Sequence, residues 1–456
     1  MSQHTHILPA KPIPYLPGLP LVGNLLAFNT DRLGFLLRIA RECGDVGGFH
    51  FGPFPVVFFS SSEHVQSILV EHAGDFQKGE ALRQAFRPVI GNGLFISEGE
   101  LHRRQRKRMA PIFQPRQIKN YANAMVSYGE RLQETWQDGA VVDVEQAMTQ
   151  LTMSIIGKVL FDEDVFSEAD ELGAAMKTAL EYVNVAASTP LSLPFSWPLP
   201  RNLRTRAALT VLNARIQAMI ETRRAYPGAK EDCLSLLLQA KDEDGNPMSD
   251  QQLFDEAVTL FGAGHETTAT ALTWAWYLLA THAEVYAAVR REVDHVLGGR
   301  SPTYDDLASL PYTLQVLKET LRLYPPAYGT SRVALREVVV DGYRIHKGQT
   351  VVIAPYVIHR RPDYFPDPDH FDPERFAPER ERQLPRYAFL PFGAGPRICI
   401  GNHFALMEGH LLLATLAQRV VFELAPGQQV EPDPKVTIRP RSGIRMVVHR
   451  RKSQGP

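Results

Sequence analysis

Apolar residues recur along most of the chain at spacings of three and four, which is the period of an amphipathic helix. From about residue 100 to residue 226 this pattern is interrupted mainly by prolines, and it predicts a series of helices. Ser249 and Asp250 then begin a stretch that continues to about Thr281 without a proline. At about 1.5 Å per residue, a helix over this stretch would cross the whole molecule. We therefore expect one long central helix.

Short runs rich in β-forming residues lie near both ends of the chain. Gly47–Phe51 and Pro55–Phe59 flank a Gly-Pro pair and predict a hairpin, which a helix over 62–71 follows. Residues 338–353 are rich in β-branched side chains around an Asp-Gly turn, and residues 436–448 predict a final β element. Since helical stretches outweigh these runs, the expected fold class is mainly α with a minor β part.

No sequence feature divides the chain into separate units. The 456 residues contain no repeat of 20 to 50 residues and no Gly/Ser-rich linker. We expect a single domain over residues 1–456, with flexible ends at 1–15 and 451–456. Prolines interrupt each apolar stretch among the first 26 residues well short of the roughly 20 residues that a membrane span needs. This pattern predicts no transmembrane anchor and no signal peptide.

Composition narrows the function classes. The 49 Lys and Arg residues balance 50 Asp and Glu residues, so the net charge of −1 gives no overall electrostatic attraction to nucleic acid. The three cysteines, Cys43, Cys233 and Cys399, are far apart in the sequence and odd in number. They therefore provide neither a disulfide framework nor a metal cage made of cysteine alone. We expect a reducing, cytoplasmic setting.

Cys399 has the most informative surroundings of the three. It lies in the stretch FGAGPRICIG at 392–401, which a helical run follows at once. The start of a helix favours a thiolate over a thiol, and glycines on both sides let a flat ligand approach the backbone. From these residues alone, Cys399 can be a metal ligand, a nucleophile or a buried structural cysteine in a glycine-rich turn.

The same stretch resembles the haem-binding loop of the cytochrome P450 superfamily, and in particular of its soluble bacterial members. The pattern Phe-x-x-Gly-x-Arg-x-Cys-x-Gly is matched at Phe392, Gly395, Arg397, Cys399 and Gly401. At average residue frequencies, a chance match of all five is on the order of one in ten thousand or lower. The resemblance implies that Cys399 is the axial thiolate ligand of haem b iron, and that the long central helix lies over the haem.

The central helix carries a second resemblance at Ala263-Gly264-His265-Glu266-Thr267-Thr268, which is similar to the family's oxygen-binding segment. Small residues leave room for dioxygen and substrate, while Glu266 and Thr267 would form a relay for proton delivery. His265 and Glu266 also match half of a zinc-protease motif. Position 269 is Ala269 instead of a second histidine, which argues against zinc.

Further residues match the family's haem-propionate donors. His102 and Arg106 are four apart on a predicted helix and so lie on one face, where both can reach one anionic ligand. The resemblance adds Arg332 and Arg397 to this set. Three other residues, namely Glu319, Arg322 and Arg375, match a buried network that fixes the geometry of the haem-side core without performing chemistry.

The resemblance implies a haem-thiolate monooxygenase. Such an enzyme inserts one oxygen atom from dioxygen into a lipophilic small molecule, here a fatty acid, terpenoid, macrolide or peptide natural product. The segments expected to line the substrate pocket are Phe86–Phe95, Val183–Trp197, Phe261–Ala263, Ala327–Thr330 and Thr437–Ile438. A peroxygenase, an isomerase and a non-enzymatic haem sensor are the alternatives. The Glu266-Thr267 pair argues against the first two, since such enzymes commonly lack it.

The electrons must come from a separate protein, because the chain contains no dinucleotide-binding or phosphate-binding glycine motif. We expect a ferredoxin or flavodoxin with its reductase, acting on a monomer. Five basic residues would form a patch on the cysteine side that steers an acidic carrier: Arg103, Arg104, Lys107, Arg108 and Arg386. A solvated basic face without a partner is the alternative interpretation.

Overall fold

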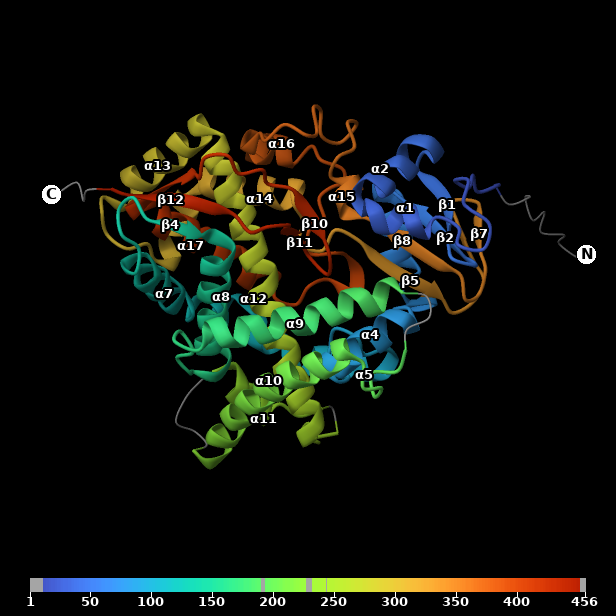
Figure 1. Ribbon diagram of the computed structural model, residues 1–456, viewed down its shortest axis with the longest axis horizontal. Helices are drawn as coiled ribbons and strands as arrows, with labels where there is room; N and C mark the ends of the chain where they lie inside the picture. The colour runs from blue at the N-terminus through green and yellow to red at the C-terminus, as the bar shows by residue number, and fades with distance from the viewer. Residues whose placement is uncertain (1–10, 190–192, 227–231, 243, 452–456) are drawn as a thin grey trace, which may run out of the picture.

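The computed structural model describes residues 11–189, 193–226, 232–242 and 244–451. Most helices gather in one large part of the molecule, and the main sheet lies with α1 and α2 at the other end (Figure 1). The helices are α1 (Leu25–Thr30), α2 (Arg32–Cys43), α3 (Ser62–Gln66), α4 (Glu80–Ile90), α5 (Gly99–Met109), α6 (Pro115–Lys119), α7 (Ala122–Glu134), α8 (Val144–Phe161), α9 (Ala169–Ser188), α10 (Pro200–Ala225), α11 (Cys233–Gln239), α12 (Asp250–Thr281), α13 (Ala283–Leu297), α14 (Pro311–Leu323), α15 (Pro355–Ile358), α16 (Pro378–Glu381) and α17 (Asn402–Arg419). The strands are β1 (Val46–Phe51), β2 (Phe54–Phe59), β3 (Phe76–Gln77), β4 (Val141–Asp143), β5 (Thr330–Ala334), β6 (Val338–Val340), β7 (Tyr343–Ile345), β8 (Thr350–Ile353), β9 (Val420–Leu424), β10 (Pro432–Pro434), β11 (Ile438–Pro440) and β12 (Arg445–Arg450). The predicted class, mainly α with a minor β part, is confirmed.

Helix α12 is the predicted central helix. Its 32 residues give it a length of about 48 Å. The Ser249 side chain caps its first turn by accepting a hydrogen bond from the Gln252 backbone N–H at 3.2 Å. Helices α8, α10, α14 and α17 all pack against it. In Figure 1 it runs in yellow through the middle of the molecule, so residues along its length can face several parts of the fold.

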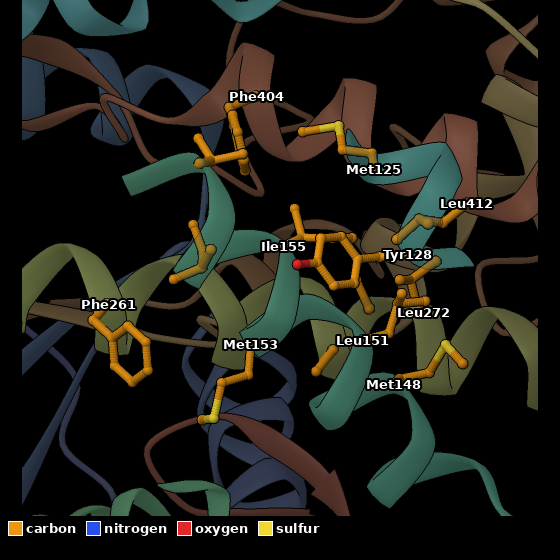
Figure 2. Packing of buried hydrophobic residues seen from close by; sticks show 14 of the residues in the cluster. Met125, Tyr128, Met148, Leu151, Met153, Ile155, Phe261, Leu272, Phe404 and Leu412 are labelled. Carbon is orange, nitrogen blue, oxygen red and sulfur yellow. The ribbon is translucent and has the colours of Figure 1, made fainter. Parts of the chain in front are cut away.

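The largest hydrophobic core lies between α7, α8, α12 and α17 (Figure 2). Its side chains come from helices far apart in the sequence, and several of them are completely buried, among them Met125, Leu151, Leu272 and Leu412. Burial of each such side chain contributes about 1.5–3 kcal/mol. This packing fixes the position of α12 relative to α17, the helix that follows the cysteine loop.

The main sheet has the strand order β1-β2-β8-β5-β3. The predicted hairpin is confirmed, with β1 and β2 antiparallel, and the predicted Asp341-Gly342 turn joins β6 to β7. Both turn residues have positive φ, 47° and 82°, as a tight hairpin turn requires. The predicted final β element is divided into β11 and β12. The sequence pattern does not predict β3, β4, β5 or β9, because short strands form only where a neighbouring strand offers its edge.

The predicted helix over 62–71 begins as α3 and continues as a π-helical turn at Ser67–Glu71. The described parts of the two expected flexible ends are held against the fold. The Lys11 backbone N–H donates to the Gly342 carbonyl at 2.9 Å, and the Arg451 backbone N–H donates to the Arg419 carbonyl at 2.9 Å. Residues 1–10 and 452–456 lie outside the described residues. Within the described part of the chain, no helix is both long enough and apolar enough to cross a membrane.

Candidate functional site

The cysteine loop is a tight turn between Leu390 and α17. The Cys399 backbone N–H donates to the Phe392 carbonyl at 2.9 Å, and the Ile398 N–H donates to the Gly395 carbonyl at 3.0 Å. Gly395 has a φ of 68°, and a Cβ there would lie 1.8 Å from the carbonyl oxygen of Leu69. Any side chain at this position would collide with the π-helical turn. The loop therefore requires glycine for both its conformation and its packing.

The Cys399 side chain is solvent-accessible, although protein atoms surround it closely. Burial raises the pKa of its thiol, and it outweighs the lowering effects of the Gly401 N–H and of Arg106. The Gly401 N–H just before α17, which begins at Asn402, lowers this pKa as the helix start predicts, but desolvation has the larger effect. A bound metal cation is the group that makes a coordinating thiol lose its proton.

The structure brings the four predicted propionate donors together. His102 is buried on α5, and Arg106 lies on the same helix, one turn later. Burial, Arg397, Arg106 and further cations, including Arg332, lower the pKa of His102 to about 3. Burial and Arg397 likewise lower the pKa of Arg332 to about 10. These groups therefore perturb one another across three separate segments of the chain.

Lys78 belongs to the same cluster, and the sequence analysis missed it. Its side chain is only 8% exposed, its Nζ lies 3.6 Å above the centre of the Phe95 ring, and it donates to the Phe95 carbonyl. Burial together with Arg332 and Arg397 lowers the pKa of Lys78 well below its usual value. No local pattern around Lys78 identifies this role, because only the fold brings it beside Arg397.

Glu98 is the carboxylate that faces these cations. It pairs with Arg397 through Oε2, and its Oε1 accepts a hydrogen bond from the Lys78 backbone N–H at 2.9 Å. Arg397 also donates to the Ser97 carbonyl at 2.7 Å. One carboxylate balances only part of the positive charge of Arg106, Arg332 and Arg397, which together with Lys78 and the neutral His102 form what we call the cationic cluster. A donor set of this composition, beside an accessible cysteine sulfur, fits a flat ligand that carries two carboxylates and a thiolate-binding iron, as haem does.

One face of α12 is accessible in the middle of the helix. Ala263 is exposed and Thr267, four residues later, is half-buried, whereas Phe261, His265 and Thr268 are buried. The Thr267 hydroxyl donates to the Ala263 carbonyl at 3.1 Å. Because residues four apart share a helix face, these two positions form an accessible strip of small side chains. Such a strip leaves room for small molecules.

Glu266 lies on a different face of α12 from Thr267. Its Oε1 accepts hydrogen bonds from the Thr437 hydroxyl and from Arg439 Nε, both at 2.7 Å. Burial by itself would raise the pKa of Glu266, but Arg439 reverses this effect and the pKa is lowered. These residues also line a polar cavity of about 250 Å³ that includes Lys177. The structure thus places the two adjacent residues of the expected relay in separate surroundings.

The buried network on α14 is confirmed. Arg322 donates to Glu319 through Nε at 2.6 Å and through Nη2 at 2.7 Å, and both side chains are completely buried. Arg375 Nε lies 3.4 Å from the Glu319 carboxylate. Arg322 also donates to the His359 and Pro368 carbonyls, at 2.9 Å and 2.6 Å. These contacts join α14 to the segment that leads to the cysteine loop.

His359 connects this network to the cysteine loop, and the sequence analysis missed it. Burial lowers the pKa of His359 to about 3, so the ring is neutral. Its Nδ1 lies 3.2 Å from the Arg322 carbonyl, and its Nε2 accepts the Leu390 backbone N–H at 3.0 Å. This arrangement requires the proton on Nδ1. A histidine directly before the arginine pair at 360–361 is the only local signal for the position.

The expected basic patch is smaller than the sequence indicated. Arg104, Lys107 and Arg386 are exposed, and Arg103 is exposed but pairs with Glu100. Arg108 was wrongly assigned to the patch. It is buried and donates to the Asp242 carboxylate at 2.7 Å, because its face of α5 packs against other parts of the fold. 

Comparison with known proteins agrees with this site. The family model described as Cytochrome P450 matches residues 13–447. The chain belongs to the cytochrome P450 family. Cyclooctatin synthase of Streptomyces melanosporofaciens is 38% identical over 92% of both chains. Pentalenene oxygenase of Streptomyces avermitilis is 32% identical over 96% of both chains. The solved structure of cyanobacterial CYP120A1 with retinoic acid bound has a TM-score of 0.85 and 29% identity, and it covers 97% of this chain and 100% of the other.

The residues of the candidate site can be related to what the cytochrome P450 monooxygenases have in common. In this family haem is bound through a cysteine thiolate, and Cys399 is the cysteine that the family's loop pattern contains. The core in Figure 2 holds α12, which carries the accessible strip, and the α14 network holds the segment that leads to the cysteine loop. The P450 fold with a central helix is confirmed.

Proposed function

We propose that this cytochrome P450 oxygenates a terpenoid or a similarly lipophilic molecule with electrons from a separate carrier protein. The observation that carries the proposal is the site's composition: an accessible Cys399 beside the cationic cluster, together with an accessible strip of small residues on α12. The names of the two Streptomyces relatives, cyclooctatin synthase and pentalenene oxygenase, support a terpenoid. Within the expected pocket segment Val183–Trp197, residues 190–192 lie outside the described residues.

In the proposed site, Cys399 would bind the haem iron as a thiolate, and four residues would hold the propionates: His102, Arg106, Arg332 and Arg397. Lys78 would add positive charge on the same side. When bound, haem supplies the activation of dioxygen. The protein supplies the anionic ligand, the cations that orient the propionates and the exclusion of water from a close-packed interior.

Thr267 and Glu266 would handle protons on two different faces of α12. The Thr267 hydroxyl donates to the Ala263 carbonyl, so its lone pairs are free to accept a hydrogen bond on the accessible strip. Glu266 lines the polar cavity, where Arg439 holds it as a carboxylate that could accept a hydrogen bond from water and so orient a proton donor. Water between the two would have to complete the relay, since the side chains occupy different faces. The presence of an acid and an alcohol at Glu266 and Thr267 supports dioxygen chemistry over the isomerase and peroxygenase alternatives.

The proposed electron carrier is an acidic ferredoxin or flavodoxin. Arg104, Lys107 and Arg386 remain exposed, and α5 adjoins the cysteine loop through the contact of Arg397 with Ser97 and Glu98. A local basic surface steers an acidic partner even when the whole chain carries a net charge of only −1.

A spectral and turnover experiment tests this function. Haem-loaded protein, reduced under carbon monoxide, is expected to show a thiolate-type Soret band that Cys399→Ala abolishes. Terpenoid hydrocarbons, fatty acids and macrolides are then compared by substrate-induced spectral shifts, and products are analysed with a ferredoxin and its reductase. Retention of the band in Cys399→Ala would overturn the ligand assignment. Product formed from hydrogen peroxide but not from dioxygen and electrons would favour a peroxygenase, and no turnover with any tight ligand would favour a sensor.

A further inference from the structure

Two adjacent carboxylates on α12 hold the segment 91–98, which joins α4 to α5. Asp255 Oδ2 accepts the Asn92 backbone N–H at 2.7 Å, and Glu256 Oε2 accepts the Leu94 backbone N–H at 2.8 Å. The Gln105 side chain donates to the Asn92 carbonyl at 3.3 Å. Two consecutive side chains of α12 thus accept hydrogen bonds from two backbone amides that are two residues apart, Asn92 and Leu94.

The segment fits against α12 without spare room. A Cβ on Gly91 would lie 2.0 Å from an Asp255 carboxylate oxygen, and a Cβ on Gly93 would lie 2.0 Å from the Thr259 hydroxyl. Gly91 also has a φ of 58°, which favours glycine. Any side chain at either position would push the segment away from the helix.

The carboxyl group of Glu256 is costly to keep in this place. Asp255 is 6% exposed and Glu256 is completely buried. Burial raises the pKa of Glu256 to about 8, the Leu94 N–H partly offsets this, and the charge of Asp255 adds to it. Within the described residues, Glu256 Oε1 has no hydrogen-bond partner. Since an apolar side chain would fill this part of the core without a desolvation cost, the hydrogen bond to the segment is what the carboxylate provides.

Helix geometry relates this contact to the candidate site. Glu256, Leu260, Ala263 and Thr267 follow one another at spacings of four, three and four, so they lie along one face of α12. Seven residues separate Glu256 from Ala263, which is about two turns or roughly 10 Å along the helix. The segment is therefore attached to the same face that carries the accessible strip.

The other end of the segment is attached to the cysteine side. Phe95 accepts a hydrogen bond from Lys78 through its carbonyl, while Arg397 holds Ser97 and Glu98. The Phe95 ring is 40% exposed and packs on Phe86 with 4.9 Å between ring centres. The segment thus spans from α12 to the cationic cluster and presents one aromatic side chain between these two attachments.

We propose that Asp255 and Glu256 are positioning residues that set the distance between segment 91–98 and α12. This distance determines the size of molecule that fits between Phe95 and the Ala263–Thr267 strip. The inference rests on the proposed haem-binding function of the site. Loss of the carboxylate contacts would let the segment move while Cys399 and the cationic cluster stay in place. Selectivity for ligand size would then change without loss of the cofactor.

The test uses haem-loaded protein with azole ligands of increasing size, which bind iron whatever the natural substrate is. Dissociation constants for imidazole and 4-phenylimidazole are measured by their spectral shifts. Glu256→Leu removes the acceptor and fills the space, Glu256→Gln keeps an acceptor, and Glu408→Leu is a matched control. Glu408 is also completely buried, and burial raises its pKa to about 8, but it lies on α17 and faces Thr268 of α12, on a different face of that helix from Glu256.

We expect Glu256→Leu to change the ratio of the two constants by about fivefold or more, and Glu256→Gln and Glu408→Leu to change it by less than about twofold. Equal changes in Glu256→Leu and Glu408→Leu would overturn the proposal. Absence of azole binding in the wild-type protein would instead overturn the proposed function. If Glu256→Leu does not fold, hydrogen exchange in the wild-type protein decides. If the Asn92 and Leu94 amides exchange as slowly as the amides of α12, the attachment is supported. If they exchange at the rate of an exposed loop, it is contradicted.

Discussion

Replacement of Glu319 by glutamine should destabilise the protein strongly, because it leaves a buried charge without its partner. Glu319 and Arg322 are both 0% exposed, and the carboxylate also accepts the Asp372 backbone N–H at 3.0 Å. Burial raises the pKa of Glu319 despite Arg322 and Arg375, which shows how costly desolvation is at this site. Loss of one partner of such a pair costs about 3–5 kcal/mol. This is a large part of the roughly 5–15 kcal/mol by which a typical protein is stable.

The chain contains a matched control for this pair. Glu100 and Arg103 have the same order and spacing on α5 and are also joined by two hydrogen bonds, both 3.0 Å long. Their side chains are 59% and 71% exposed, so solvent screens the interaction. Glu100→Gln should therefore cost only a few tenths of a kcal/mol.

The free energy of unfolding of the haem-loaded variants is measured by urea titration, followed by circular dichroism and by the Soret band. Because His359 links Arg322 to Leu390, the Soret band of Glu319→Gln should be lost at the same lower urea concentration as the helical signal. Equal, small losses of stability in Glu319→Gln and Glu100→Gln would refute the reasoning, since burial would then make no difference to the value of the pair.

Three further predictions concern proton delivery, electron transfer and pH. Thr267→Ala should keep haem content and ligand affinity but lower the product formed per electron about tenfold or more, with hydrogen peroxide formed instead; an unchanged yield would remove Thr267 from the relay. Neutralisation of Arg104, Lys107 and Arg386 should slow reduction by an acidic ferredoxin at low salt, and the difference should vanish near 1 M salt, where charges are screened over about 3 Å. Rates insensitive to both changes would reject docking at this face. Burial raises the pKa of Glu408 to about 8, so the folded state keeps a proton that the unfolded state releases above about pH 4.5. Stability should therefore fall by about 1.4 kcal/mol per unit between those pH values, and Glu408→Gln should reduce this slope; identical slopes would contradict the buried carboxylic acid.

The sequence alone determined the features that depend on local pattern. The apolar period and the Ser249 cap define α12, the Asp341-Gly342 turn requires positive φ, and the motif around Cys399 indicates a haem-thiolate loop. These features depend on residues within a few positions of one another, so their physical causes are contained in short segments.

Tertiary structure decided every feature that depends on residues far apart in the chain. Only folding places Lys78 in the cationic cluster and His359 in contact with Leu390 beside the cysteine loop. Arg108, which the sequence assigned to the surface patch, forms a buried pair with Asp242 instead. Glu266 and Thr267 are adjacent in sequence, but successive side chains of a helix point about 100° apart, so the two lie in different surroundings. Burial and long-range charge control these outcomes, and both depend on which segments pack together, a property that no local pattern contains.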